Sequence, residues 1–267
     1  MPKFGWKPDT AQHIAETPVF TSVMRAQRYG VSQKLPSSVN LLGKHFFRRD
    51  QKLSSACVGF GLSGAIYARL HFLGFDVPLF SPLAIYGVGR QREGIFKNKP
   101  LPDNGCYPFL AMAGIMYNGI VYEKDWPFDQ DYLSRVEQEV PLDIFQKASQ
   151  FRVGGVHRIV QTGDALVETC MRALATAHPI PLGMMVGQAF SDYSRGKGPV
   201  DVETGPDVGG HETFLIGYED NGDTFLTANS WGRDQGDEGV VRITRDKLTH
   251  PSTSDIYDFT ITDQKAA

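Results

Sequence analysis

The chain has 267 residues, enough for one large two-lobed domain or two small domains with a substantial core. Hydrophobic residues make up 41% and charged residues 21%, which is ordinary for a globular protein. The formal net charge is -3, without a Lys/Arg-rich block or an acidic tail, so nothing electrostatic indicates binding to nucleic acid or to a membrane surface.

The three cysteines, Cys57, Cys106 and Cys170, are odd in number and widely spaced, which does not indicate a disulfide framework. The absence of a Cys-x-x-Cys pair disfavours a zinc ribbon or a thioredoxin-like site. The N-terminus lacks the apolar core of a signal peptide, and no stretch of about 18 apolar residues occurs. We therefore expect a cytoplasmic protein with reduced thiols. Secretion by a non-classical route leaves no such mark and stays open.

In chain order, proline and glycine punctuate residues 1–35, whose periodicity is weak, so we expect an N-terminal extension there. The stretch that follows Pro36 indicates extended chain. The clearest helix spans residues 54–74, with Ser54 or Ser55 as N-cap and Gly74 as C-cap. Shorter helices are predicted at 80–92 and 108–118, and a partly helical surface excursion at 129–150.

The second half of the chain has a different pattern of apolar and turn residues. Residues 163–177 predict an amphipathic helix. Short strands separated by Gly, Asp and Asn turns are then predicted at 182–187, 211–219, 223–231 and 239–244. A helical first half and a strand-rich second half favour a two-lobed α+β protein with a cleft between the lobes.

Cys57 lies in the first turn of the strongest predicted helix. The helix dipole and the free backbone N–H groups there favour an anion, which would lower the thiol pKa and populate the nucleophilic thiolate. Gln51, six residues upstream, would donate a hydrogen bond to an oxygen that gains negative charge beside Cys57, forming a two-donor oxyanion hole with the Cys57 N–H. Taken alone, Cys57 is as often a small buried residue and Gln51 more often an exposed loop residue.

His211 follows two glycines and begins an alternating strand, where glycines let a ligand or another backbone approach closely. Asn229 is a residue type that can accept the proton on one ring nitrogen of a histidine, which would fix its tautomer and turn the other nitrogen to the thiol. Trp231 would cover this bond and keep water out. Each has an ordinary alternative: a structural histidine, a turn asparagine and a core tryptophan.

Taken together, these residues occur in an order found in one family. The chain resembles the papain-like cysteine peptidases (family C1) over roughly residues 35–262. The matching motifs are Q-K-L-S-S-A-C at 51–57, N-G-C-Y-P at 104–108, N-G-I-V-Y-E-K-D-W-P-F at 118–128, G-G-H-E at 209–212, N-S-W-G at 229–232 and G-D-E-G-V-V-R-I at 236–243.

The resemblance implies a papain-like two-lobed α+β fold over residues 36–267. A helical left lobe (about 50–150) and a β-barrel-like right lobe (about 151–267) would flank the active-site cleft. It also implies a cysteine-type endopeptidase that hydrolyses a peptide or protein substrate through a thioester. Cys57, His211 and Asn229 would form the triad and Gln51 the oxyanion donor, with no metal or organic cofactor.

The resemblance further implies a set of substrate-binding residues: Gly105, Cys106, Tyr107, Pro108, Gly210, Glu212 and Trp231. The backbone at Gly105 and Cys106 would pair with an extended substrate, and Cys106 would be a free thiol at the cleft edge. Tyr107 and Pro108 would wall the main specificity pocket (S2). Glu212, in place of a small residue, would bias that pocket towards a basic or polar side chain.

Two departures from the family pattern stand near the nucleophile. Val58 replaces the usual tryptophan after it, and Ser54 replaces a cysteine. The usual disulfide of the left lobe is therefore missing, which agrees with a reducing compartment.

Three other functions stay open. The chain could be a catalytically silent peptide-binding member of the fold, or a transpeptidase, deamidase or isopeptidase that uses the same thioester. It could also be an interaction protein, through residues 1–35 or 129–150. Residues 1–35 are too few for the family's full inhibitory proregion. They could form a short plug, a packing arm on the right lobe, or a tail for a regulatory partner.

Overall fold

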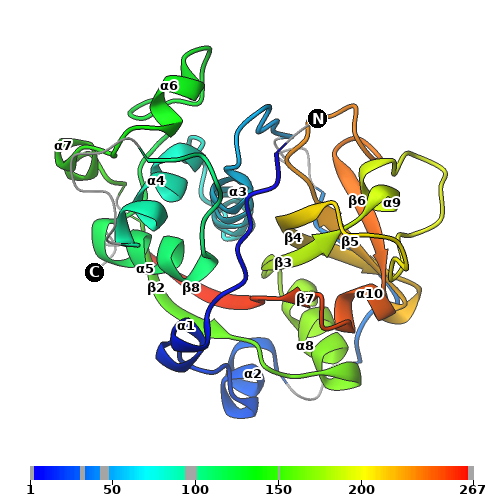
Figure 1. Cartoon of the computed structure of the whole chain (residues 1–267). Coiled ribbons are helices and arrows are strands. Elements are labelled where there is room, and N and C mark those ends of the chain that lie inside the picture. The colour runs from blue at the N-terminus through cyan, green and yellow to red at the C-terminus, as the bar shows by residue number, and fades with distance from the viewer. Residues whose placement is uncertain (1–2, 31–33, 43–47, 94–100, 150, 264–267) are drawn as a thin grey trace.

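The computed structural model describes residues 3–30, 34–42, 48–93, 101–149 and 151–263. The helices between residues 57 and 146 lie on one side of the molecule, and the main sheet lies on the other with the helices between residues 163 and 249 (Figure 1). The helices are α1 (Ala11–Glu16), α2 (Ser22–Tyr29), α3 (Cys57–Phe72), α4 (Pro82–Arg92), α5 (Pro108–Asn118), α6 (Tyr132–Val136), α7 (Leu142–Gln146), α8 (Gly163–Ala175), α9 (Gln188–Ser191) and α10 (Arg245–Thr249), with a short 3-10 turn at Asp220–Gly222. The strands are β1 (Val39–Asn40), β2 (Phe151–Arg158), β3 (Ile180–Val186), β4 (Gly209–Glu219), β5 (Thr224–Ala228), β6 (Val240–Thr244), β7 (Thr253–Ser254) and β8 (Tyr257–Asp263).

The central helix α3 confirms the strongest helix prediction but begins three residues later, at Cys57. The expected serine cap is wrong. Ala56 is the N-cap, and its methyl group can make no capping bond. The two serines do not cap the helix either, because the Ser54 hydroxyl donates to the Gln51 carbonyl and the Ser55 hydroxyl to the Asp103 carbonyl. Gly74 directly follows the C-cap at a φ of +87°, a conformation that glycine adopts without strain.

Helices α4 and α5 match the predicted spans closely, since each begins with a proline at its first turn and is otherwise rich in apolar residues. They pack closely because small residues separate them: a Cβ on Gly114 would lie 2.6 Å from a Val88 methyl group. The predicted excursion at 129–150 contains α6 and α7, and residue 150 lies outside the described residues.

The main sheet is antiparallel, with the strand order β6-β5-β4-β3-β7 and β1 added beside β4. Strand β4 is buried on both faces. Because side chains alternate along a strand, Phe214 and Ile216 join the core around α3, α4 and α5, while Leu215 joins a second core around α8. One strand therefore connects the two hydrophobic cores.

The sequence did not predict α1, α2 or the pair β2–β8. Strand β2 contains Gly154 and Gly155, and its partner β8 lies about a hundred residues away, with a register shift between Val153 and Val156. A broken apolar pattern and a distant partner leave little local signal. The domain limits expected at residues 35 and 150 stay a prediction.

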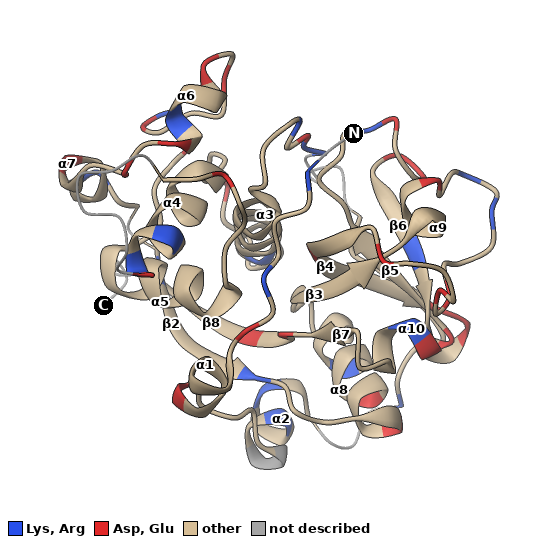
Figure 2. Ribbon diagram, in the orientation of Figure 1, with Lys and Arg blue, Asp and Glu red and all other residues tan. Residues whose placement is uncertain are grey.

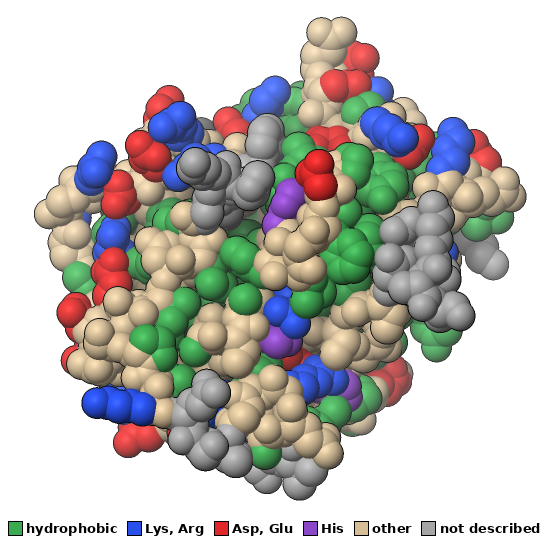
Figure 3. Space-filling view, turned by 180° about the vertical axis from the view of Figure 1, so that it is seen from behind, with side chains coloured by type: hydrophobic (Ala, Val, Ile, Leu, Met, Phe, Trp, Pro, Cys, Tyr) green, Lys and Arg blue, Asp and Glu red, His purple; other side chains and the backbone are tan. Residues whose placement is uncertain are grey.

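Lysine and arginine residues are interspersed with aspartate and glutamate residues over both sides of the molecule (Figure 2). On the face seen from behind, charges of both signs are mixed with apolar side chains (Figure 3). Among the described residues, no helix is both long enough and apolar enough to cross a membrane.

Candidate active site

Gln51 joins the two sides of the molecule just before α3. Its backbone N–H donates to the Ser230 carbonyl at 2.7 Å, and its side-chain oxygen Oε1 accepts from the Ser230 hydroxyl at 2.7 Å. With Oε1 occupied, the amide Nε2 must point the other way. It donates to the carbonyl oxygens of Ser54 and Lys3, each at 2.8 Å. The buried Gln51 amide thus presents its donors to backbone oxygens beside the start of the Cys57 helix.

A chain of hydrogen bonds determines the tautomer of His211. The Phe190 carbonyl can only accept, so the Gln235 amide nitrogen donates to it at 3.2 Å. The Gln235 oxygen then accepts from the Asn229 amide nitrogen at 2.7 Å. This leaves Asn229 Oδ1 as the acceptor for His211 Nε2, at 2.7 Å. In this network the His211 proton is on Nε2, and Nδ1 has no hydrogen-bond partner among the described residues.

Aromatic rings enclose His211. The Trp231 ring lies 4.6 Å from the imidazole between centroids, tilted by 37°, and Phe190 and Phe4 lie edge-on at 5.8 and 6.4 Å. His211 is fully buried, and this burial lowers its pKa to about 4, although the bond to Asn229 acts in the opposite direction. The ring is therefore neutral at pH 7 in this state.

The Cys57 thiol does not have the lowered pKa expected from its place at the helix start. Burial raises the pKa to about 12, outweighing the lowering effect of backbone hydrogen bonds from Glu212, Gly5 and Val58. The prediction is wrong for this state because chain from outside the helix covers the thiol completely. Removing water from a thiolate costs more than the helix dipole returns.

The covering chain is residues 3–9, which we call the N-terminal segment. It runs between α3 and the main sheet (Figure 1). The N–H groups of Gly5 and Trp6 donate to the Gly210 carbonyl at 3.1 and 3.0 Å. On the other side, the Cys106 N–H donates to the Gly5 carbonyl at 2.8 Å and the Lys7 N–H to the Cys106 carbonyl at 3.1 Å. The segment is thus held by backbone pairing from both sides.

The Trp6 side chain fills the pocket beside this backbone. Its indole covers Gly183 and Gly210, where an added Cβ would lie 2.0 and 2.7 Å from ring atoms. Its Nε1 donates to Asp255 Oδ2 at 3.0 Å. Glycine at both strand positions is required for the large ring to lie flat against the sheet.

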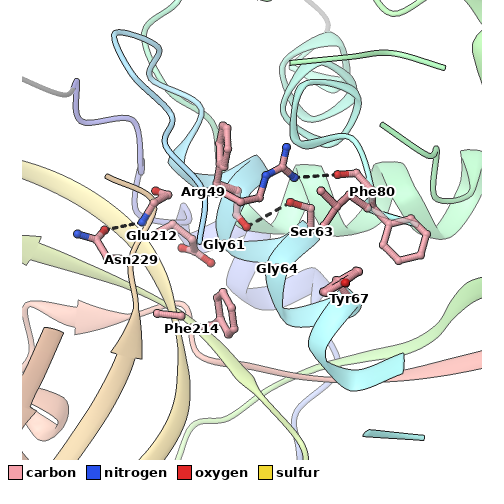
Figure 4. Close-up of a pocket in the computed structure, with 13 residues that line it drawn as sticks. Arg49, Gly61, Ser63, Gly64, Tyr67, Phe80, Glu212, Phe214 and Asn229 are labelled. Atoms are coloured by element: carbon pink, nitrogen blue, oxygen red, sulfur yellow. Dashed lines mark hydrogen bonds between the residues drawn. The ribbon is translucent and has the colours of Figure 1, made fainter. Parts of the chain in front are cut away.

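Glu212 lies on the same face of β4 as this pocket. It pairs across the sheet with Gly183, and paired residues direct their side chains to the same face. Figure 4 shows Glu212 beside Gly61 of α3, and a Cβ on Gly61 would lie 2.8 Å from Glu212 Cγ. The residue is fully buried, and neither carboxyl oxygen has a partner among the described residues. Burial, with the charges of Asp255 and Asp9, raises its pKa well above the usual value and so favours the neutral form of the carboxyl group.

The other predicted substrate-binding residues occupy mixed positions. Gly105 has a φ of +96° and abuts the Gly5 carbonyl, where an added Cβ would lie 2.4 Å from the oxygen. Tyr107 caps α5, and its ring contacts His13, 4.9 Å away between centroids. Pro108 begins α5 and is buried.

One expectation about this region is wrong. Cys106 is a free cysteine, but its thiol is not at the cleft edge. The thiol points into the core against Gly89, is completely buried, and has a raised pKa because of that burial. Only the Cys106 backbone faces the N-terminal segment.

Three residues of the site were missed from the sequence, Ser230, Gln235 and Asp255, and a plug was one of the three roles that the sequence left open for residues 1–35. Ser230 and Gln235 belong to the run N-S-W-G-R-D-Q, whose polar spacing was a usable signal. Asp255 lies outside any motif, and the segment bonds mainly through its backbone. Among the described residues, no group of three His, Cys, Asp or Glu side chains is arranged to hold a metal ion.

Comparisons with known proteins indicate the family and the fold of the chain. A family model described as "Papain family cysteine protease" matches residues 98–258, more than half of the chain. This range holds His211 and Asn229, whereas Cys57 and Gln51 lie before it. Cathepsin R of Mus musculus is 25% identical over 215 residues, which cover 76% of this chain and 58% of the cathepsin. An uncharacterized peptidase C1-like protein, L477, of Acanthamoeba polyphaga mimivirus is 26% identical over 201 residues, 73% of this chain and 63% of its own.

The chain thus spans about three fifths of the length of these curated relatives. Among solved structures, xylellain, a cysteine protease from Xylella fastidiosa, superposes with a TM-score of 0.76 at 21% identity, covering 96% of this chain and 95% of its own. Procathepsin B S9 from Trypanosoma congolense gives 0.72 at 17% identity, covering 98% and 87%. These similarities confirm the predicted papain-like two-lobed α+β fold.

Proposed function

Because this chain belongs to the papain family of cysteine proteases, we propose that it hydrolyses peptide bonds with Cys57 as nucleophile, His211 as base and Asn229 as orienting residue. One observation carries this proposal. The Gln51 amide bonds a backbone carbonyl oxygen, that of Lys3, at 2.8 Å beside the start of the Cys57 helix. A substrate carbonyl in that place would have the donor that its oxygen needs on becoming an oxyanion.

The reaction proceeds in two halves. The Cys57 proton passes to His211 Nδ1, and the thiolate attacks the peptide carbonyl carbon. Gln51 Nε2 and the Cys57 N–H hold the oxygen while it is negative. The imidazolium then gives its proton to the departing amine, which leaves a thioester on Cys57. His211 next takes a proton from water, and the resulting hydroxide attacks the thioester carbon. The carbon–sulfur bond breaks, the Cys57 thiolate takes the proton back from His211, and the acid product leaves.

The N-terminal segment supports a regulatory role for residues 3–9. It occupies the Gln51 donor through Lys3 and pairs with the backbone of Gly210 and Cys106. No substrate can bind that backbone while the segment does. We therefore take the segment to be a short built-in plug, one of the three roles considered for residues 1–35, and activity to require its departure.

The pocket filled by Trp6 supports a preference for one kind of substrate side chain. Asp255 accepts from the indole N–H, and the unpartnered carboxyl group of Glu212 lies on the same face of the sheet as this pocket. A substrate side chain with a hydrogen-bond donor, basic or polar, would satisfy both. A library screen in which Glu212→Ala keeps the wild-type preference at this pocket would overturn the part assigned to Glu212.

The proposal is tested by reacting the purified chain with an epoxide-type thiol inhibitor and locating the adduct by mass spectrometry. The experiment is run on the wild type and on Trp6→Ala, which lacks the side chain that fills the pocket. We expect labelling at Cys57 in Trp6→Ala, and its loss when His211→Ala is added. Cys106 and Cys170 are completely buried and serve as internal controls.

Equal labelling of the three cysteines, or unchanged labelling of Cys57 without His211, would contradict the catalytic pair. A peptide library incubated with and without an added amine acceptor then separates hydrolysis from acyl transfer. A hydrolysed acid product supports a peptidase, and a new amide supports a transpeptidase. A cytoplasmic location is a separate proposal, which fractionation of the producing cells tests.

A further inference from the structure

The far end of the N-terminal segment enters a buried cluster of charged groups. Arg158 of β2 bonds Asp9 Oδ2 through NH2 at 2.8 Å and Asp255 Oδ1 through NH1 at 2.7 Å. The Tyr257 hydroxyl of β8 also bonds Asp9, and it accepts from Arg158 at 3.0 Å. All four residues are buried, with Asp9 8% exposed and Asp255 2% exposed. The cluster therefore exists only while the segment is docked.

The groups around Asp9 determine whether its carboxyl group is charged or neutral. Two neutral donors approach it: the Tyr257 hydroxyl and, at 3.3 Å, the Phe109 N–H. The His13 ring of α1 lies 3.3 Å from Asp9 Oδ1. The other titratable groups are those of Arg158, Asp255, the unpartnered Glu212 and the buried Cys106 thiol.

The charges of this cluster do not balance when Asp9 is ionised. Among the described residues, Arg158 is the arginine in contact with the carboxyl groups of Asp9 and Asp255, and it already neutralises Asp255, which stays with the body of the protein. Asp255 is further bound by the Trp6 indole and by the Asp9 N–H at 2.9 Å. Docking thus carries a second carboxyl group out of water towards an existing negative charge. Burial and Asp255 raise the pKa of Asp9 to about 6, although Tyr257 and Arg158 act against them.

We propose that this cluster is a docking site that accepts the Asp9 side chain as a neutral carboxylic acid, so that the segment covers Cys57 more firmly in acid than at neutral pH. The inference rests on the proposed role of residues 3–9 as a plug. Docking in acid takes up as much as one proton from water, and release of the segment in acid returns it, whereas at neutral pH Asp9 is already mostly ionised and almost no proton is exchanged. No other reactant is involved.

The direction of the pH effect follows from the pKa of Asp9 in the undocked and in the docked segment. In the undocked segment its pKa returns to the ordinary value of about 3.9, and in the docked segment it is about 6. A raised pKa means that docking is favoured in acid and weakens as the pH rises towards 6. Between pH 4.5 and 7.0 the fraction of molecules with an open cleft should increase about 25-fold.

The test measures the rate at which 2,2′-dipyridyl disulfide labels Cys57 in the full-length chain, at pH 4.5 and 7.0. Wild type is compared with Asp9→Asn, which keeps the size of the side chain but cannot ionise. Intrinsic thiol reactivity cancels in the ratio of the two rates. We expect the ratio of wild type to Asp9→Asn to increase about 25-fold between the two pH values. A ratio that does not change with pH overturns the proposal.

Two controls separate the causes. His13→Gln removes the imidazole ring that lies 3.3 Å from Asp9 Oδ1 and should keep the pH dependence. Loss of the pH dependence in this variant would overturn the role of Asp9. Trp6→Ala should speed labelling at both pH values. If Trp6→Ala is labelled faster, but the ratio of wild type to Asp9→Asn does not change with pH, only the proposed effect of pH on docking is overturned. If Trp6→Ala is not labelled faster, the N-terminal segment does not cover Cys57, and its proposed role as a plug is overturned as well. Peptide hydrolysis by Trp6→Ala tests the peptidase function separately, because labelling requires no catalysis.

Discussion

The side-chain amide of Gln51 donates a 2.8 Å hydrogen bond to the backbone carbonyl oxygen of Lys3, so a peptide oxygen of the chain itself accepts from the donor that the proposed mechanism assigns to the oxyanion. The Ser230 hydroxyl holds the other end of the same amide at 2.7 Å. The donor is thus already oriented before any substrate arrives. Preorganised donors of this kind cost no rearrangement during the reaction.

Replacing Gln51 by alanine should therefore slow peptide hydrolysis about 100-fold or more in kcat, because one of two oxyanion donors is lost. The measurement is steady-state hydrolysis by Trp6→Ala with and without Gln51→Ala. Epoxide labelling of Cys57 should change little, since the attacking thiolate does not depend on the amide. A kcat that stays within twofold would remove Gln51 from the oxyanion site.

Gln235 should act on the reaction only through Asn229 and His211. Gln235→Leu removes the acceptor of the Asn229 amide nitrogen, so Oδ1 is held towards His211 less firmly, with only the Ser230 N–H still orienting the amide. We expect kcat to fall about tenfold, the equivalent of one hydrogen bond of about 1.4 kcal/mol, with KM unchanged. Nitrogen NMR of His211 should show a mixture of ring tautomers. Gln235→Glu keeps an acceptor oxygen and should restore the Nε2–H form. A single unchanged tautomer in Gln235→Leu would rule out this positioning role.

Gly183→Ala should weaken the docking of the N-terminal segment without changing any residue of the segment. An added Cβ would lie 2.0 Å from Trp6 Nε1, and the ring would have to move away from Asp255. Labelling of Cys57 at pH 7 should then become at least tenfold faster, the effect of losing about 1.4 kcal/mol of docking free energy. The matched control is Gly198→Ala, since an added Cβ there meets no atom within 4 Å. Equal rates in the two variants would contradict the role of Trp6.

Glu212→Gln should make the protein more stable at neutral and alkaline pH. The folded-state pKa of Glu212 is raised, so its neutral form stabilises the fold in acid, and this stability is lost as the pH rises towards that pKa. Glutamine has the same size and no charge to bury. The difference in melting temperature between Glu212→Gln and wild type should therefore increase from pH 4 to pH 8. A difference that is constant over this range would mean that Glu212 is not buried as a neutral acid.

The sequence predicted best the elements whose signals are local. Helices α4 and α5 begin with prolines and continue through apolar runs, and strands β4 to β6 are rich in β-branched and aromatic residues between turn residues. Local patterns failed at β2 and β8, where glycines interrupt one strand and the partner is distant. They also failed at the cap of α3, where the serines bond to other segments.

The predicted thiol pKa shows a different kind of limit. A helix start lowers the pKa of a cysteine only while the thiol keeps its contact with water, and burial under a remote segment reverses the shift. Cys106 is similar, because its backbone lies where the motif indicates but its thiol turns into the core against Gly89. A motif specifies a position along the chain, whereas burial depends on what packs over it.

By itself, then, the sequence determined the family and the two-lobed fold, because motifs such as N-S-W-G and the periodicity of α3 are carried by neighbouring residues. Only the tertiary structure decided that residues 3–9 lie in the cleft and that Asp9 meets Arg158, Asp255 and Tyr257. The reason is physical. The segment is held by backbone hydrogen bonds to Gly210 and Cys106, which leave no side-chain pattern, and by a buried charge cluster whose members are up to about 250 positions apart.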